Sequence, residues 1–216
     1  MKTYRALIFD WDGTLADSTA HIVDAVQFAF QQNGLPPPSI DDARSIIGLS
    51  LENAMLQLGR NDARDKMDDL ITAYRTYYFR SDRPIKLFDQ AYPLLQESRK
   101  HYLLGIATGK SRRGLERGLD DTKTRQFFCA TRTADECASK PNPDMILSLC
   151  DEWNIKPSET LMIGDTTHDL LTAHNAGADA VGVASGAHSV QKLNTAPNIA
   201  IFNNLWQLQK WLLLEN

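Results

Sequence analysis

The sequence predicts an α/β fold built on a Rossmann-like parallel sheet, with an all-helical segment inserted after the first strand. From residue 84 onward, short apolar runs alternate with helical patterns, which is typical of a parallel sheet with helices on both faces. Residues 18–82 carry helical patterns only. The 216 residues suffice for one domain with a large insertion. We therefore expect a catalytic core of residues 1–16 and 84–216 and a helical cap of residues 17–83.

The N-terminal third of the chain contains one strand followed by helices. Residues 4–10 include the apolar run Ala6-Leu7-Ile8-Phe9, which predicts a buried strand. Residues 18–33 place apolar side chains at helical spacing, with Ser18 as the expected N-cap. Gly34 ends this helix, and the prolines at 36–38 prevent its continuation. Further helices are expected at 40–47, 51–58 and 62–80.

Strands and helices alternate in the remainder of the chain. The strand candidates are short apolar runs, and the helix candidates are longer segments bounded by prolines, polar caps or glycines such as Gly177. The expected strands cover residues 102–107, 127–131, 160–163, 179–183 and 199–202. The expected helices cover residues 88–100, 111–120, 142–153, 167–176 and 204–214.

Composition and charge argue against several classes of protein. The net charge is −4 and no basic stripe is present, so a nucleic-acid-binding protein is disfavoured. No apolar run approaches the roughly 18 residues that span a bilayer, and the N-terminus lacks a signal-peptide pattern. The three cysteines lack metal-ligand spacing and are expected to be reduced. These features predict a cytoplasmic protein without membrane association. The sequence leaves the oligomeric state open between a monomer and a homodimer.

Two carboxylates, Asp10 and Asp12, directly follow the first strand in the run FDWDGTLADS. Alternate residues of an extended chain point the same way, and ligands of open α/β folds bind at the C-terminal edge of the sheet. One carboxylate can attack phosphorus, while the other protonates the leaving oxygen and later activates water. The alternative interpretation is an Asp-Gly turn made by Asp12 and Gly13.

Two more motifs follow later strands. Thr108-Gly109-Lys110 opens the expected helix 111–120, and a hydroxyl with free backbone N–H groups at a helix N-terminus suits a phosphate. Lys140 precedes Pro141, which biases the lysine toward an extended backbone, and its ammonium could balance carboxylates and hold a phosphoryl group. The alternatives are a plain N-cap by Thr108 and a solvated surface lysine at position 140.

The fourth motif is GDTTHD, residues 164–169, which follows the expected strand 160–163. Its two carboxylates, Asp165 and Asp169, lie where a strand turns into a helix. Mg²⁺ prefers oxygen ligands from one or two carboxylates together with water and phosphate. The alternative gives Asp165 the N-cap of the helix and makes Asp169 a first-turn acid that the helix dipole favours.

These four motifs, in this order, resemble those of the haloacid dehalogenase-like phosphohydrolases over residues 4–205. The resemblance implies that Asp10 is the nucleophile and a metal ligand, and that Asp12 is the general acid and base, with its backbone carbonyl facing the metal. Lys140 would pair with the nucleophile and the phosphate. The second acid, Asp12, distinguishes phosphoryl-transfer members from dehalogenating ones, which lack it.

The same resemblance assigns the remaining motif residues. Thr108 and Gly109 match the segment that binds phosphoryl oxygens. Asp165 matches a metal ligand, and Asp169 matches an acid that either binds the metal or orients the site. The implied cofactor is Mg²⁺, which offsets the carboxylates so that a phosphate dianion can approach. The implied partner is a small phosphorylated metabolite.

The helical insertion is similar to the cap of the phosphoglycolate-phosphatase and β-phosphoglucomutase branch, which closes over the site and excludes water. Arg44, Gly48 and His21 are candidates for substrate selection by the cap. Gly48 could instead end a helix, and His21 could lie on a helix surface.

Three other functions are alternatives to a phosphatase. A β-phosphoglucomutase-like mutase would use the same core residues. A phosphonate hydrolase would need a cap lysine in an apolar pocket, and Lys66, the only lysine in 18–82, lies in a charged helix. A binding module without activity is disfavoured because Asp10, Asp12 and Lys140 are all present.

Overall fold

The computed structural model describes residues 4–80 and 84–214 and contains one six-stranded sheet. Its strands are ordered β3-β2-β1-β4-β5-β6, and every neighbouring pair is parallel. The predicted α/β fold with a Rossmann-like parallel sheet is therefore confirmed. The strands are β1 (Ala6–Phe9), β2 (Leu103–Thr108), β3 (Ala130–Thr133), β4 (Thr160–Gly164), β5 (Asp179–Val183) and β6 (Ala200–Phe202).

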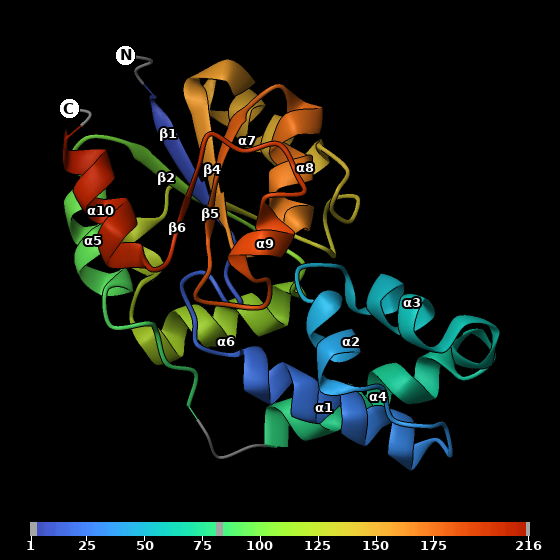
Figure 1. Cartoon of the computed structure of the whole chain (residues 1–216). Coiled ribbons are helices and arrows are strands. Elements are labelled where there is room, and N and C mark those ends of the chain that lie inside the picture. Colours follow the sequence, from blue (N-terminus) through green and yellow to red (C-terminus); the bar gives the residue numbers. More distant parts are fainter. Residues whose placement is uncertain (1–3, 81–83, 215–216) are drawn as a thin grey trace.

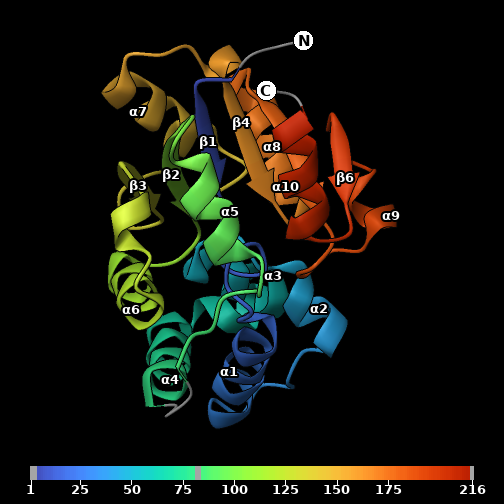
Figure 2. The same ribbon diagram turned by 90° about the vertical axis from the view of Figure 1, so that its left-hand side faces the viewer.

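Helices cover both faces of the sheet (Figures 1 and 2). Successive residues of β1 point to opposite faces: Leu7 and Phe9 join one buried cluster, while Ala6 and Ile8 join the other. The first cluster includes side chains from α5 (Ala91–Ser98), α6 (Arg112–Thr122) and α10 (Leu205–Leu214). The second includes side chains from α7 (Asp144–Trp153) and α8 (Thr167–Ala176). Both faces of β1 are fully buried, which explains its uninterrupted apolar sequence.

Four helices lie together beyond the C-terminal edge of the sheet, between β1 and α5 in the chain (Figure 1). They are α1 (Thr19–Gln32), α2 (Ile40–Ser45), α3 (Leu51–Arg64) and α4 (Met67–Arg80). The chain leaves the sheet and returns at one place, because Ala16 pairs with Leu87 in an antiparallel bridge. Two hydrogen bonds flank that bridge, from Asp17 N–H to the Lys86 carbonyl (2.9 Å) and from Phe88 N–H to the Leu15 carbonyl (2.9 Å).

The break between the third and fourth helices differs from the prediction. The sequence predicts separate helices at 51–58 and 62–80, but α3 continues to Arg64 and α4 begins at Met67. The interruption inside α3 is a kink at Arg60, whose φ of 49° and ψ of −127° are not helical. A short turn at Asp65 and Lys66 separates the two helices.

Smaller differences from the predicted elements occur at the ends of the core strands and helices. The helix predicted at 88–100 is shorter, and the strand predicted at 127–131 begins only at Ala130, after a 3₁₀ turn at Arg125–Phe127. A short helix, α9 (Val190–Leu193), was not predicted and is capped by the hydroxyl of Ser189, which accepts from Lys192 N–H. A single turn of this kind carries too little periodicity to be recognised in a sequence.

Two expectations drawn from composition can be compared with the structure. Cys129, Cys137 and Cys150 are free thiols, as the reduced state requires. No helix within residues 4–80 and 84–214 combines the length and apolarity needed to cross a membrane.

Gly177 ends α8 as predicted, and its backbone has a φ of 77°. No atom lies within 4 Å of where a Cβ would stand, so a substitution there is opposed by backbone conformation alone. We expect Gly177→Ala to lower the free energy of unfolding by about 1–2 kcal/mol, measured by urea titration. Gly177→Asn should cost less, because asparagine tolerates this conformation better. Equal stability of the alanine variant and the wild type would contradict this account.

Candidate active site

The parallel topology brings the four predicted motifs to one edge of the sheet. Asp10 directly follows β1, Thr108 is the last residue of β2, and Asp165 directly follows β4. Lys140 comes from the segment between β3 and α7. Because β1 is hydrogen-bonded to both β2 and β4, groups that are more than 150 residues apart in the chain meet at the centre of this edge.

Lys140 is the centre of the buried charge network. Its ammonium donates to Asp10 Oδ1 at 2.7 Å and to Asp169 Oδ1 at 2.5 Å. The lysine side chain is 0% exposed, as is that of Asp169. The Lys140–Pro141 peptide bond is cis. Burial lowers the pKa of Lys140, but the Asp10 and Asp169 carboxylates outweigh it and hold the pKa above its usual value. The lysine is therefore charged and is not a solvated surface residue.

Asp165 is held by the segments that follow β1 and β5. The Thr14 hydroxyl donates to its Oδ1 at 2.7 Å, and the Ala187 N–H donates to its Oδ2 at 2.7 Å. Gly13, with a φ of 86°, lies so close to this carboxylate that a Cβ at position 13 would collide with it. The turn after Asp12 thus needs glycine for both backbone conformation and space.

Asp169 has a second partner in its own helix. Thr166 is the N-cap of α8, and its N–H and hydroxyl donate to Asp169 Oδ2 at 3.0 and 2.7 Å. The alternative that made Asp165 the N-cap is therefore wrong, whereas Asp169 does lie in the first turn. Asp169 is fixed from both sides, by Thr166 and by Lys140.

Burial strongly affects the carboxylates at this edge. It raises the pKa of Asp10 well above its usual range, against the opposing charge of Lys140. It also raises the pKa of Asp165 to about 7, with the negative charge of Asp169 contributing and the Ala187 N–H opposing. The protein alone therefore leaves these groups with too little positive charge around them.

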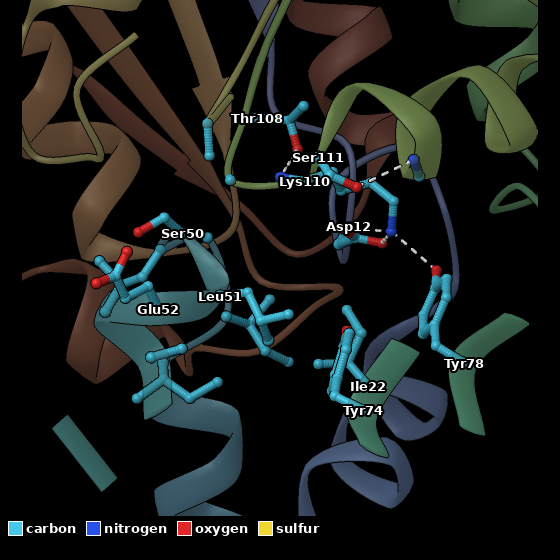
Figure 3. Close-up of a pocket in the computed structure, with 18 of the residues that line it drawn as sticks. Asp12, Ile22, Ser50, Leu51, Glu52, Tyr74, Tyr78, Thr108, Lys110 and Ser111 are labelled. Carbon is cyan, nitrogen blue, oxygen red and sulfur yellow. Dashed lines mark hydrogen bonds and ion pairs between the residues drawn. The ribbon is translucent and has the colours of Figure 1, made fainter. Parts of the chain in front are cut away.

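Asp12 makes contacts that the sequence did not predict. Ser18, the expected N-cap of α1, makes no capping hydrogen bond; its hydroxyl instead donates to Asp12 Oδ1 at 2.5 Å. Lys110 donates to both carboxylate oxygens of Asp12, at 3.0 and 2.9 Å, and to the hydroxyl of Tyr78 at 2.8 Å. Its ammonium also lies 4.6 Å from the centre of the Tyr78 ring. Lys110 therefore connects Asp12 with helix α4 (Figure 3).

A cavity of about 260 Å³ opens above these groups, between the sheet edge and helices α1, α3 and α4. Of the predicted residues, Asp10, Asp12, Thr108 and Gly109 line it, whereas Lys140, Asp165 and Asp169 lie outside its lining. Thr108 does not cap α6; Ser111 does so, and Thr108 Oγ1 accepts from Lys110 N–H at 3.2 Å.

The three residues proposed for the cap are placed differently from one another. Gly48 lines the cavity with a φ of 94° in the loop between α2 and α3. A Cβ at Gly109 would collide with the carbonyl groups of Gly48 and Leu49, so this loop lies directly on the core.

Arg44 and His21 are not among the residues that line the cavity. Arg44 instead donates to the Gly186 carbonyl at 3.0 Å. His21 Nε2 lies 3.2 Å from the Tyr78 carbonyl oxygen. The structure thus does not bring these two side chains to the candidate substrate site, because each is engaged by a backbone carbonyl.

The loop after β5 contributes groups that sequence reasoning missed. Besides the Ala187 N–H, it supplies His188, whose Nδ1 accepts from Thr167 N–H at 3.0 Å. Burial, reinforced by the nearby His168, lowers the pKa of His188 to about 4, so its ring is neutral at physiological pH. The sequence did hold one signal for these groups. The loop follows the predicted strand 179–183, and the C-terminal ends of parallel strands share one sheet edge.

Comparison with known proteins agrees with this geometry. Residues 7–183 match the family model for haloacid dehalogenase-like hydrolases. The chain belongs to the haloacid dehalogenase-like hydrolases. It is 30% identical over 183 residues to Pyrophosphatase PpaX of Bacillus mycoides, covering 83% of each chain. The predicted family and enzyme class are confirmed.

Solved structures show the same fold along nearly the whole chain. A hydrolase from Pseudomonas syringae superposes with a TM-score of 0.88 at 26% identity, covering 96% of this chain and 97% of the other. A hydrolase of the haloacid dehalogenase-like family from Streptococcus pneumoniae gives a TM-score of 0.84 at 25% identity, covering 97% and 98%. The likeness therefore includes helices α1–α4 as well as the sheet.

Haloacid dehalogenase-like hydrolases generally use a divalent metal, and the residues of this site fit one. Asp10, Asp165 and Asp169 are buried, and each offers a carboxylate oxygen within 4.8 Å of the others. Asp10 Oδ2 has no hydrogen-bond partner within the described part of the chain. Lys140 contacts two of these three carboxylates, Asp10 and Asp169, so one ammonium leaves an excess negative charge that a divalent cation would offset.

The raised pKa of Asp165 predicts a pH-dependent stability in the presence of chelator. An unfolded aspartate has a pKa of about 3.9, whereas the folded value is about 7. The folded protein therefore binds the proton more tightly, and the stability that this provides at pH 4 is lost as the pH rises through 7. Each pKa unit corresponds to roughly 1.4 kcal/mol.

Urea unfolding of the wild type and of Asp165→Asn between pH 4 and 8 measures this effect. We expect the wild type to lose stability relative to the variant over this interval. A difference that stays constant with pH would show that the pKa of Asp165 is not raised in the folded state.

Proposed function

We propose that this chain is a Mg²⁺-dependent phosphohydrolase that cleaves a small phosphate monoester through a phosphoryl-aspartate at Asp10. The observation that carries the proposal is the pairing of Asp10 and Asp12 in one cavity. Asp10 has a buried oxygen that accepts no hydrogen bond from residues 4–80 or 84–214, and Asp12 lies at the same cavity wall with its own separate partners. The name of the Bacillus mycoides relative, a pyrophosphatase, supports phosphate as the group transferred.

In the first step, a carboxylate oxygen of Asp10 attacks phosphorus and the bond from phosphorus to the ester oxygen breaks. Asp12, in its protonated form, gives its proton to that oxygen, so that an alcohol leaves. Lys140 fixes the orientation of Asp10 through its 2.7 Å hydrogen bond. Thr108 and Gly109, at the end of β2, would bind the phosphoryl oxygens.

In the second step, the Asp12 carboxylate takes a proton from water, and the resulting hydroxide attacks the phosphoryl group. The bond between the Asp10 oxygen and phosphorus breaks, which releases inorganic phosphate and restores the carboxylate of Asp10 and the protonated carboxyl group of Asp12. The overall reaction is ester plus water giving alcohol plus phosphate. The Ser18 and Lys110 contacts keep Asp12 at the cavity wall during both steps.

Asp10 and Asp165, with the backbone carbonyl of Asp12, would hold Mg²⁺, and Asp169 would either bind it or orient the site. When bound, the metal neutralises negative charge so that a phosphate dianion can approach Asp10. We also propose that residues 17–83 act as a cap, since helices α1, α3 and α4 within this range form the far walls of the cavity. Closing a site in this way excludes bulk water and thereby strengthens the electrostatic interactions within it.

Release of inorganic phosphate from a panel of phosphate esters tests this proposal. We expect turnover with Mg²⁺, its loss with chelator, and a fall of at least about 10³-fold in Asp10→Asn, which lacks the nucleophile. Leu147→Lys, an exposed position on α7, is the control for expression and folding. If Asp10→Asn retained wild-type turnover, the aspartyl-phosphate route would be wrong.

The role of Asp12 is tested separately by the leaving group. Asp12→Asn cannot donate a proton, so kcat for an alkyl phosphate should fall by about 10²–10⁴-fold. The decrease should be much smaller for p-nitrophenyl phosphate, because its leaving oxygen departs without a proton. Equal losses for both substrates would assign Asp12 a role other than general acid.

A further inference from the structure

The walls of the cavity change in character with distance from Asp10. At the sheet edge they are polar and belong to the proposed phosphoryl-transfer site. Toward helices α1, α3 and α4 they are formed mainly by aliphatic and aromatic side chains, several of which Figure 3 labels. These apolar residues are Ile22 and Val26 from α1, Leu51 and Ala54 from α3, and Ile71 and Tyr74 from α4.

The size of the cavity suits a compact ester. Its volume of about 260 Å³ is near the lower end of the roughly 300–1,000 Å³ typical of ligand pockets. A phosphoryl group at the Asp10 end leaves room for a leaving group of several heavy atoms. That leaving group would contact the apolar walls on α1, α3 and α4.

The charged groups at this end of the cavity offer no surplus of positive charge. Among the described residues that line it, the cations are Lys110 and Arg75. All three N–H donors of Lys110 have acceptors, two on Asp12 and one on Tyr78. Arg75 is exposed, and the acids Glu52 and Asp135 also line the cavity. A second anionic group would lose its hydration here without gaining a free buried cation.

We infer that the substrate is a phosphate monoester whose leaving group is uncharged and mainly apolar, not a second phosphate or a carboxylate-bearing alcohol. This inference rests on the proposed phosphohydrolase function and narrows it. The expected substrate of this chain therefore differs from the pyrophosphate that the name of its Bacillus mycoides relative indicates. The leaving group gains binding from the aliphatic walls of α1 and α3 and from the Tyr74 ring, while Lys110 remains bonded to Asp12.

The experiment compares kcat/KM, with Mg²⁺, for esters of similar size. n-Propyl phosphate and 2-phosphoglycolate share a phosphorylated CH2 group, which carries an ethyl group in the first and a carboxylate in the second. Benzyl phosphate carries an aromatic ring at that place, and pyrophosphate has a second phosphate. We expect benzyl phosphate and n-propyl phosphate to exceed 2-phosphoglycolate by at least about tenfold. A kcat/KM for 2-phosphoglycolate or pyrophosphate equal to or above that of n-propyl phosphate would overturn the inference and leave the phosphohydrolase function standing.

A binding measurement separates the two proposals if no ester is hydrolysed. Benzylphosphonate and phosphonoacetate cannot release phosphate by ester cleavage, so their affinities with Mg²⁺ report on the cavity alone. Tighter binding of benzylphosphonate, together with an absence of turnover, would support the apolar site and contradict the phosphohydrolase proposal. Tighter binding of phosphonoacetate would contradict the apolar site whatever the turnover.

A pair of matched variants tests whether the apolar wall at Leu51 causes the preference for an uncharged leaving group. Leu51→Lys places a cation at the apolar end, and should lower kcat/KM for benzyl phosphate at least about tenfold while raising that for 2-phosphoglycolate. Leu147→Lys makes the same change at an exposed leucine of α7 that does not line the cavity. It should leave both values unchanged. An unchanged ratio of the two substrates in Leu51→Lys would overturn the inference.

Discussion

The arrangement of this site depends on the buried ion pairs that the ammonium of Lys140 makes with Asp10 and Asp169. The ammonium lies between the two carboxylates, with no exposure to solvent. A buried ion pair loses hydration on both sides, and removal of one partner leaves a charge without compensation. Three chain segments, from after β1, before α7 and at the start of α8, are therefore held together by one side chain.

The chemistry and the candidate specificity of the site come from different parts of the molecule. The acids and the lysine belong to the sheet edge, where buried hydrogen bonds hold Asp10, Asp165 and Asp169 in place. The far walls of the cavity belong to α1, α3 and α4. Lys110 and Ser18 connect the two parts, because one reaches Tyr78 on α4 and the other stands at the start of α1. Both Lys110 and Ser18 donate hydrogen bonds to Asp12.

The sequence was sufficient for β1, β2, β4 and β5, because each is a largely buried and mainly apolar run. It also placed the motif residues at one edge, because parallel strands end at the same edge. The bounds of β3, which reads Ala-Thr-Arg-Thr and is mostly half-buried, were predicted less well. The sequence was insufficient where a contact joins distant segments. The Lys110–Tyr78 hydrogen bond, the Ala187 N–H on Asp165 and the diversion of Ser18 from capping α1 to Asp12 are of this kind. The secondary-structure propensity of a segment carries no information about such pairs. The kink at Arg60 likewise departs from the regular backbone pattern of its own helix.

The antiparallel bridge between Ala16 and Leu87 has a consequence for how this protein can change over evolutionary time. The two chain crossings that connect α1–α4 to the sheet lie side by side, so the chain enters and leaves the inserted helices at a single junction. A recombination event that replaced the whole interval would have to match that junction and the contacts with the core, such as those of Tyr78 with Lys110 and of Arg44 with Gly186. New ligand preferences could then be acquired in one genetic exchange while the sheet and its buried charges were inherited intact.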